Sequence, residues 1–266
     1  MKMDVNFGHV AKNYAQYRND LPDELLKSLT LRGISFEGKK VVDLGCGTGV
    51  FSRALQKEGA NVVGVEPALA LIEEALTIDA KKGYRIDYQH GFSEDTSLRT
   101  DAYEIVTVLR AWHWFNREKT LIEIQRILQA HGSLIIVDSG FLSHQPIVDD
   151  TLHFIRKRMP NGQLKRAGAK ATSSQLINSF PVEWFEEWQH AQFDLQETYK
   201  FYYDVHFSNE EWCGRVGSLS WLTDFDEKER NDLLEQLYRY IQKKYGHVQH
   251  QIRHGCYVAV LKRLAE

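Results

Sequence analysis

The residues from Val41 to Val50, which read VVDLGCGTGV, constrain the fold of this 266-residue chain more than any other stretch. Their apolar start predicts a buried strand, and the three alternate glycines predict a tight turn with φ > 0. The residues from Phe51 to Glu58 then predict a helix. Because the free N–H groups at that helix start point toward the turn, a ligand with polar edges can lie there beside the carboxylate of Asp43.

Two phosphate-binding motifs come close to this pattern, and neither fits it. The dinucleotide fingerprint G-x-G-x-x-G needs a third glycine where Val50 stands. A phosphate loop needs Gly-Lys followed by Ser or Thr, which this stretch lacks. The other alternative is a glycine turn that binds no ligand.

A second buried strand is predicted over residues 61–66, and it ends in Glu66. Glu66 follows Asp43 at about the ~20-residue spacing of a ribose-binding acid, and a carboxylate there can accept both ribose hydroxyls. The alternative is a solvated acid at a strand end. Pro67 fixes the next turn, and a helix is predicted over residues 69–78.

Strands and helices continue to alternate as far as Asp138, with further strands at 84–90, 103–109 and 133–138. This order predicts an α/β fold with a doubly wound parallel sheet and right-handed crossovers. The alternation stops between residue 139 and about residue 190. Helical segments over 146–159, 173–178 and 181–189 predict an insertion above the carboxyl edge of the sheet. Strands at 193–207 and 255–264 are expected to form an antiparallel edge.

The pattern Asp-Leu-Gly-Cys-Gly-Thr-Gly of residues 43–49 closely resembles the first motif of class I S-adenosylmethionine (SAM)-dependent methyltransferases. Residues 110–116, Arg-Ala-Trp-His-Trp-Phe-Asn, and the Ala-x-x-Tyr-x-x-Tyr-Arg segment of residues 11–18 narrow this resemblance. They are similar to the small-molecule subgroup of methyltransferase type 11-like enzymes that includes trans-aconitate methyltransferase. The resemblance covers residues 5–138 well, and residues 193–264 only by layout.

This resemblance implies a mainly parallel seven-stranded, Rossmann-like sheet with an antiparallel last strand and a helical insertion after strand five. It also implies SAM as cofactor and S-adenosylhomocysteine as product. Four parts are expected along the chain: an N-terminal helical lid, 1–38; a SAM-binding core, 39–138; a helical substrate cap, 139–192; and the C-terminal part of the sheet with its helices, 193–266.

The cofactor site implied by the resemblance includes the glycine turn, the ribose acid and a loop that meets adenine. Phe92 stands where a common form of the adenine loop has Asp. Tyr14 and Arg18 are expected either to cover the cofactor or only to pack against the domain. The expected cofactor-binding residues are Tyr14, Arg18, Asp43, Gly45, Cys46, Gly47, Glu66, Pro67, Phe92, Ser93, Glu94 and Leu109.

The acceptor is expected beside the carboxyl end of the fourth strand, where ligands bind in open α/β sheets. His113 is the candidate general base, and a structural histidine bound to a backbone carbonyl is its alternative. Arginines there could bind an acidic acceptor bidentately, or could serve only the structure. The expected substrate-binding residues are Arg110, Trp112, Trp114, Arg215 and Ser218.

Charge and cysteine content exclude several other classes. A net charge of −3 argues against a nucleic-acid substrate. The three cysteines are scattered without a C-x-x-C spacing, so neither a disulfide framework nor a metal site is expected. The start lacks the apolar core of a signal peptide, and no run reaches the ~18 apolar residues of a membrane span. A cytoplasmic monomer or homodimer is expected, with no membrane partner.

The predicted function is SAM-dependent transfer of a methyl group to a small organic acceptor, with a carboxylate or hydroxyl favoured. Six tryptophans, mostly outside the expected strands, suit an aromatic pocket for such an acceptor. Two alternatives stay open: a methyltransferase that acts on protein or RNA, and a SAM-binding module without catalysis.

Overall fold

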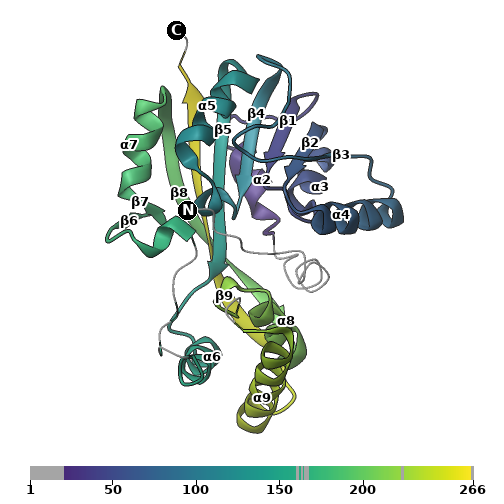
Figure 1. Cartoon of the computed structure of the whole chain (residues 1–266), viewed down its shortest axis with the longest axis vertical. Helices are drawn as coiled ribbons and strands as arrows, with labels where there is room; N and C mark the ends of the chain where they lie inside the picture. The colour runs from purple at the N-terminus through teal and green to yellow at the C-terminus, as the bar shows by residue number, and fades with distance from the viewer. Residues whose placement is uncertain (1–20, 160–161, 163, 165–167, 223–224, 265–266) are drawn as a thin grey trace.

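The computed structural model describes residues 21–159, 162, 164, 168–222 and 225–264. A seven-stranded sheet with the order β3-β2-β1-β4-β5-β9-β8 forms the larger part of the molecule, and a smaller helical lobe lies at one end of it (Figure 1). The strands of the sheet are β1 (Lys40–Leu44), β2 (Asn61–Glu66), β3 (Asp87–His90), β4 (Tyr103–Leu109), β5 (Leu128–Phe141), β8 (Phe193–Phe207) and β9 (His250–Arg263).

The pairing of the strands confirms the predicted fold class. β1, β2, β3, β4 and β5 pair in parallel, whereas β9 runs antiparallel to both of its neighbours. As expected, the last two strands form the antiparallel edge of the sheet, with β9 between β5 and β8 and with β8 outermost. The burial of the two strands explains this order: Cys256, Val258 and Ala259 of β9 are fully buried, whereas much of β8 is exposed.

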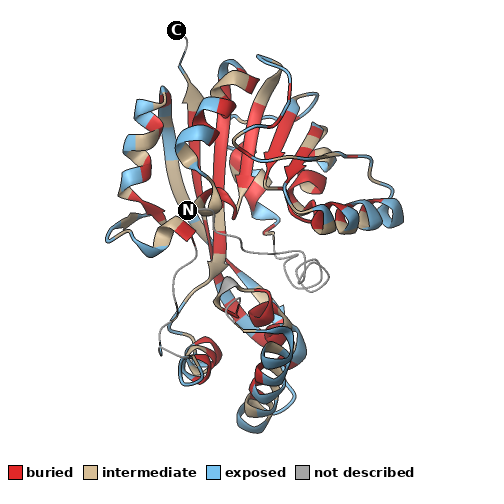
Figure 2. Cartoon of the chain, in the orientation of Figure 1, coloured by how far each residue is buried: buried red, intermediate tan, exposed pale blue. Residues whose placement is uncertain are grey.

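Helices cover both faces of the sheet and bury its strands from two sides (Figure 2). Adjacent residues of β1 belong to different apolar clusters: Val41 packs with α2 and α3, and Val42 packs with α5 and α7. This two-sided burial explains the near-continuous apolar runs of the central strands. The helices of this part are α2 (Glu24–Thr30), α3 (Val50–Lys57), α4 (Leu69–Lys82), η2 (Trp112–Trp114), α5 (Arg117–Ile127) and α7 (Val182–His190).

The smaller lobe has its own apolar cluster, to which the ends of β8 and β9 also contribute. We call it the cap lobe and define it by its helices α6 (Pro146–Arg156), α8 (Asn209–Gly217), η4 (Ser220–Leu222) and α9 (Glu227–Tyr245). Capping boxes start α8 at Ser208 and α9 at Asp226.

The predicted insertion, 139–192, is therefore divided between the two parts of the molecule. α6 belongs to the cap lobe, but α7 packs on the sheet, because Trp184 and Trp188 are one turn apart and both are buried in the sheet core. Most of the cap lobe instead comes from the segment between β8 and β9.

The helix predicted over 173–178 was wrong. This segment contains β6 (Leu176–Ile177), which pairs with β7 (Phe180–Pro181). Asn178 and Ser179 adopt φ values of 46° and 67°, a left-handed conformation that suits a tight hairpin turn and breaks a helix. Just before it lies η3 (Gly168–Ala171).

Candidate functional site

The glycine turn between β1 and α3 has the predicted conformation. Gly45, Gly47 and Gly49 have φ values of 65°, 56° and 76°. A Cβ on Gly45 would lie 2.7 Å from the Cβ of Ala111, which is closer than real Cβ contacts. The turn therefore needs glycine both for its backbone conformation and for its approach to the residues after β4.

Glu66, at the end of β2, is bound to that turn. One carboxylate oxygen accepts a 3.0 Å hydrogen bond from the N–H of Gly47, and the other accepts a 3.0 Å bond from the N–H of Ala68. Burial raises the pKa of the Glu66 carboxyl, and these two backbone bonds oppose that shift. Each oxygen keeps a further lone pair for a ligand hydroxyl.

A cavity of about 330 Å³ lies over the carboxyl ends of the parallel strands and extends to the cap lobe. It brings together nine of the predicted site residues: Gly45, Gly47, Glu66, Pro67, Leu109, Arg110, His113, Trp114 and Arg215. Nine further lining residues were not predicted: Leu71, Ala111, Phe115, Asp138, Ser139, Gly140, Phe141, Leu219 and Trp221.

Asp43 and Cys46 lie behind the turn and border a separate cavity of about 20 Å³. The Asp43 carboxylate accepts hydrogen bonds from the hydroxyls of Ser52, at 2.6 Å, and Thr107, at 3.2 Å. Burial raises the pKa of Asp43 to about 7 and raises the pKa of the Cys46 thiol well above its usual range. Asp43 therefore supports the turn from within and does not line the large cavity.

The loop after β3 also lies outside the lining of the large cavity. Phe92 is 55% exposed, and the Ser93 hydroxyl lies 2.9 Å from that of Thr120. Glu94 accepts a 3.0 Å hydrogen bond from the N–H of Asn116, just before α5. These contacts fix the loop on the start of α5, and the adenine role of residues 92–94 stays a prediction.

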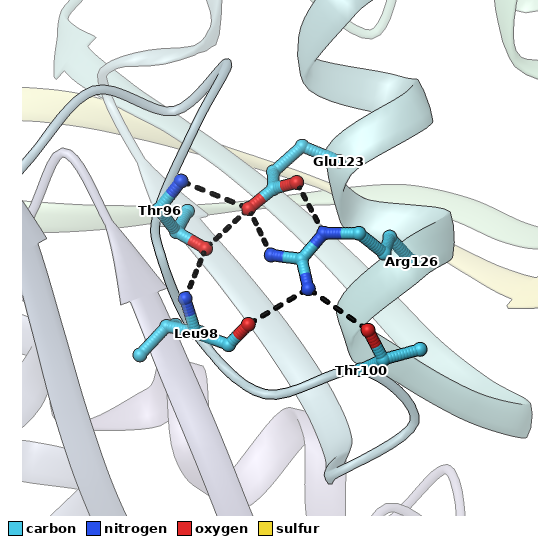
Figure 3. A network of polar contacts seen from close by, with 5 residues as sticks. All are labelled: Thr96, Leu98, Thr100, Glu123 and Arg126. Carbon is cyan, nitrogen blue, oxygen red and sulfur yellow. Dashed lines mark hydrogen bonds and ion pairs between the residues drawn. The ribbon is translucent and has the colours of Figure 1, made fainter.

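A polar network holds the rest of this loop against α5 (Figure 3). Arg126 donates two hydrogen bonds to Glu123, at 2.8 and 2.6 Å, and one each to the carbonyl of Leu98 and the hydroxyl of Thr100. Glu123 also accepts a 2.8 Å hydrogen bond from the backbone N–H of Thr96. Burial alone would raise the pKa of Glu123, but these donors hold it below its usual range. The network orders the chain between β3 and β4.

Two other predicted residues, Trp112 and Ser218, are described by the structure and do not line the cavity. Trp112 is 2% exposed and packs in the sheet core, because its apolar ring fits between the strands and α5. The Ser218 hydroxyl donates a 2.7 Å hydrogen bond to the backbone carbonyl of Arg215, so this side chain caps the end of α8. Tyr14 and Arg18 lie outside the described residues.

Two buried arginines border the cavity from different parts of the molecule. Arg110 follows β4, and its φ of 56° is unusual for a residue with a side chain. Its N–H donates a 2.8 Å hydrogen bond to Val137 of β5, which holds this conformation. Arg215, on α8 of the cap lobe, is 2% exposed, and its guanidinium lies 5.9 Å from the ring centre of Phe141.

His113 and Asp138 both line the cavity. The rings of His113 and Trp114 lie 5.0 Å apart. Burial would raise the pKa of Asp138, but the positive charges of Lys170 and His113 lower it below its usual range. Asp138 is a site residue that our sequence analysis missed. The available signal was its position, since it comes after the apolar run of a central strand, as Asp43 and Glu66 do.

Within residues 21–159, 162, 164, 168–222 and 225–264, no three His, Cys, Asp or Glu side chains are grouped to hold a metal ion. In the same ranges, none of the helices combines the length and the apolar character of a membrane span.

Residues 42–136 match the family model described as a methyltransferase domain. A Dictyostelium discoideum protein named as a methyltransferase is 31% identical over 141 residues, which are 53% of this chain and 51% of that protein. The ubiquinone biosynthesis O-methyltransferase of Maricaulis maris is 32% identical over 102 residues, 38% of this chain and 40% of the enzyme. The chain thus spans about half or less of these relatives.

A solved structure from Anaeromyxobacter dehalogenans, named as a type II methyltransferase, covers 92% of this chain and 97% of its own, with a TM-score of 0.62 and 19% identity. At that identity, the likeness establishes the fold, which is the class I methyltransferase fold. The family match and the named relatives make part of this chain similar to methyltransferases, and the solved structure shares its fold. They do not distinguish the trans-aconitate subgroup from other subgroups.

Proposed function

We propose that this chain is a class I SAM-dependent methyltransferase that transfers a methyl group to a small organic acceptor, with a carboxylate or a hydroxyl as the favoured accepting group. The observation that carries the proposal is a single cavity that joins the glycine turn and Glu66 to an aromatic and arginine-lined end at the cap lobe. One end suits a nucleoside, and the other suits an organic acid or phenol.

The donor end fits SAM on two features of the chain. The turn presents backbone N–H groups without intervening side chains, because Gly45 and Gly47 stand there. The buried carboxylate of Glu66 keeps lone pairs toward the cavity for the two hydroxyls of a ribose. Pro67 and Leu71 add apolar surface beside that carboxylate.

The acceptor end combines apolar walls with positive charge. Phe141 and Trp221, whose ring centres lie 5.9 Å apart, line it beside Arg215, which suits a flat or apolar small molecule. The two buried guanidinium groups of Arg110 and Arg215 suit an anionic group on that molecule, because planar guanidinium binds carboxylate bidentately. The hydroxyl alternative draws on the Maricaulis maris relative, which is named as an O-methyltransferase.

The reaction needs little from the protein besides alignment. SAM, when bound, supplies a methyl group already activated on a sulfonium. The cavity walls exclude water and hold the accepting oxygen in line with the methyl group. A carboxylate acceptor is already deprotonated near neutral pH and needs no base, whereas a hydroxyl acceptor loses its proton to His113.

The experiment is a screen of the full chain with labelled SAM against small carboxylic acids and phenols, with methylated product detected by mass spectrometry. The proposal expects labelled product from at least one acid or phenol. Glu66→Ala should remove product formation at low SAM concentration, and Glu104→Gln, at the opposite end of β4, should not. Methylation only of added protein or RNA would support the alternative substrate class. Tight SAM binding with no product from any class would support the non-catalytic alternative.

A further inference from the structure

Asp138 lines the cavity and belongs to a polar cluster that includes neither Glu66 nor the two arginines. Lys170 of η3 is ion-paired with Asp138 of β5, and its amine also lies 3.1 Å from the Ser179 hydroxyl. The Ser179 hydroxyl donates a 3.2 Å hydrogen bond to the same carboxylate oxygen of Asp138. The side chains of Lys170 and Asp138 are only 11% and 20% exposed. Three segments of the chain therefore meet at one shielded carboxylate.

This group is attached to His113 in two ways. First, both Asp138 and His113 line the cavity, and the positive charge of His113 contributes to the lowered pKa of Asp138. In addition, Gly168 lies against the backbone carbonyl of His113, where a Cβ would overlap the carbonyl oxygen, and its φ is +53°. Because only glycine allows this approach, η3 can lie directly on the short helix η2 that carries His113. Lys170 is thus fixed relative to both Asp138 and His113.

We propose that Asp138 is a positioning residue, which orients the His113 ring and stabilises its protonated form during transfer to a hydroxyl acceptor, with Lys170 as its counter-charge. This inference rests on the proposed function. As the acceptor oxygen bonds to the methyl carbon and the carbon–sulfur bond breaks, the hydroxyl proton passes to a ring nitrogen of His113. That nitrogen later releases the proton to water, so the step leaves one proton and a neutral thioether.

The other charges around His113 explain why a carboxylate is needed there. Arg110, after β4, and Arg215, from α8, border the same cavity, and both oppose a positive charge on the ring. Glu66 lies at the donor end and is bound to the glycine turn. Among the described residues that line the cavity, Asp138 is therefore the carboxylate placed to offset the arginines at the acceptor end. Lys170 is ion-paired with the same carboxylate and therefore reduces the negative charge that Asp138 presents to His113.

Two substitutions should then act in opposite directions on His113. Asp138→Asn removes a negative charge and makes protonation of the ring harder. Lys170→Met removes the positive counter-charge and makes protonation easier. A structural role alone predicts that both substitutions weaken the same contact and act in the same direction. The opposite signs are what distinguish a positioning role from a structural one.

The first test follows the titration of the His113 ring by NMR in the full-length, ¹³C-histidine-labelled chain, with the His113 signal identified by its loss in His113→Gln. We expect the titration midpoint to move down by about one pH unit in Asp138→Asn and up by about one pH unit in Lys170→Met. Lys170→Arg keeps the charge and should leave the midpoint in place. A midpoint unchanged in both neutral variants, or moved in the same direction by both, overturns the inference.

The matched control is the Lys39–Glu104 ion pair, a 2.6 Å contact at the opposite end of β4. Glu104→Gln should leave the His113 titration where it is. If Asp138→Asn does not fold, Lys170→Met and Lys170→Arg still test the sign, since they keep Asp138.

The second test measures kcat against pH with a hydroxyl acceptor found in the screen. Asp138→Asn should lower kcat by about tenfold or more and leave the KM for SAM unchanged. Unchanged kcat in Asp138→Asn overturns the inference. The two proposals fail separately: a shifted His113 titration without methylation of any small acceptor contradicts the proposed function, whereas methylation without a shifted titration contradicts the role of Asp138.

Discussion

The carboxylate of Glu66 accepts a 3.0 Å hydrogen bond from the backbone N–H of Gly47, so the acid at the end of β2 and the glycine turn after β1 form one unit. The sequence places these residues 19 positions apart, and parallel pairing of β1 with β2 brings their carboxyl ends together. A ligand that contacts the turn therefore meets Glu66 as well.

Substitution of Glu66 by Ala should weaken SAM binding by about 1.5–3 kcal/mol, because it removes charge-assisted hydrogen bonds to the ligand. Isothermal titration calorimetry measures this directly. Glu104→Gln, which removes a carboxylate far from the cavity, is the matched control and should bind SAM normally. Unchanged affinity in Glu66→Ala would refute the ribose role of this residue.

Substitution of Gly47 by Val should abolish SAM binding without unfolding the chain. The φ of Gly47 is 56°, which a β-branched residue adopts only with strain, and the new side chain would occupy space where the ligand meets the backbone. Circular dichroism should show a folded protein with a cooperative thermal transition, and calorimetry should show no binding. Retained binding would exclude the turn as the cofactor site.

Substitution of Arg215 by Met should raise the KM for a carboxylate acceptor by about 10- to 100-fold, the loss expected for one charge-assisted contact. The Kd for SAM should change little, because Arg215 lies at the cap-lobe end of the cavity. Steady-state kinetics with a carboxylate and with a neutral phenol separate the two acceptor classes. Arg239→Met is the control, since its side chain is 73% exposed on α9. Equal loss for both acceptors would contradict an anion-binding role.

Asp43 should make the stability of the ligand-free protein depend on pH. Burial raises its pKa to about 7, whereas its pKa in the unfolded chain is about 3.9. Between these values the folded state holds the proton more tightly, so the free energy of unfolding should fall as pH rises from about 4 to 7.

The substitution Asp43→Asn removes the titrating group, so the free energy of unfolding of this variant should not fall in the same way. The variant should therefore become more stable relative to the original chain as the pH rises. Urea unfolding at pH 5 and pH 8 measures the difference. Asp23→Asn serves as the control, since Asp23 is exposed and makes no side-chain capping bond. A constant difference between Asp43→Asn and the original chain at both pH values would rule out the raised pKa.

Local signals were sufficient for most of the sheet and for the conformation of the glycine turn, with Glu66 beside it. The glycines with left-handed φ, the apolar central strands and the acid at the end of β2 each depend on a few neighbouring residues, and the structure has them as predicted. β8 matched its predicted range, 193–207, because its alternation of apolar and exposed residues is long and regular.

The acceptor end depends on contacts between distant segments, which local patterns do not show. Phe141, Leu219 and Trp221 reach the cavity because β5 extends beyond its predicted end at Asp138 and because α8 and η4 fold back over it. Trp112 was assigned to the substrate on its position after β4, but packing turned its ring into the core. Asp138 gained its partner Lys170 from a segment 32 residues away.

The paired strands β8 and β9 extend without a loop from the sheet, where Phe193 pairs with Arg263, into the cap lobe, where Phe207 pairs with His250. The cap lobe is consequently not a module that can be exchanged on its own. A graft of its helices onto another sheet of this fold would need a recipient whose last two strands have the same length and twist. Acceptor choice and sheet geometry would then diversify together in evolution, whereas the donor site could stay fixed.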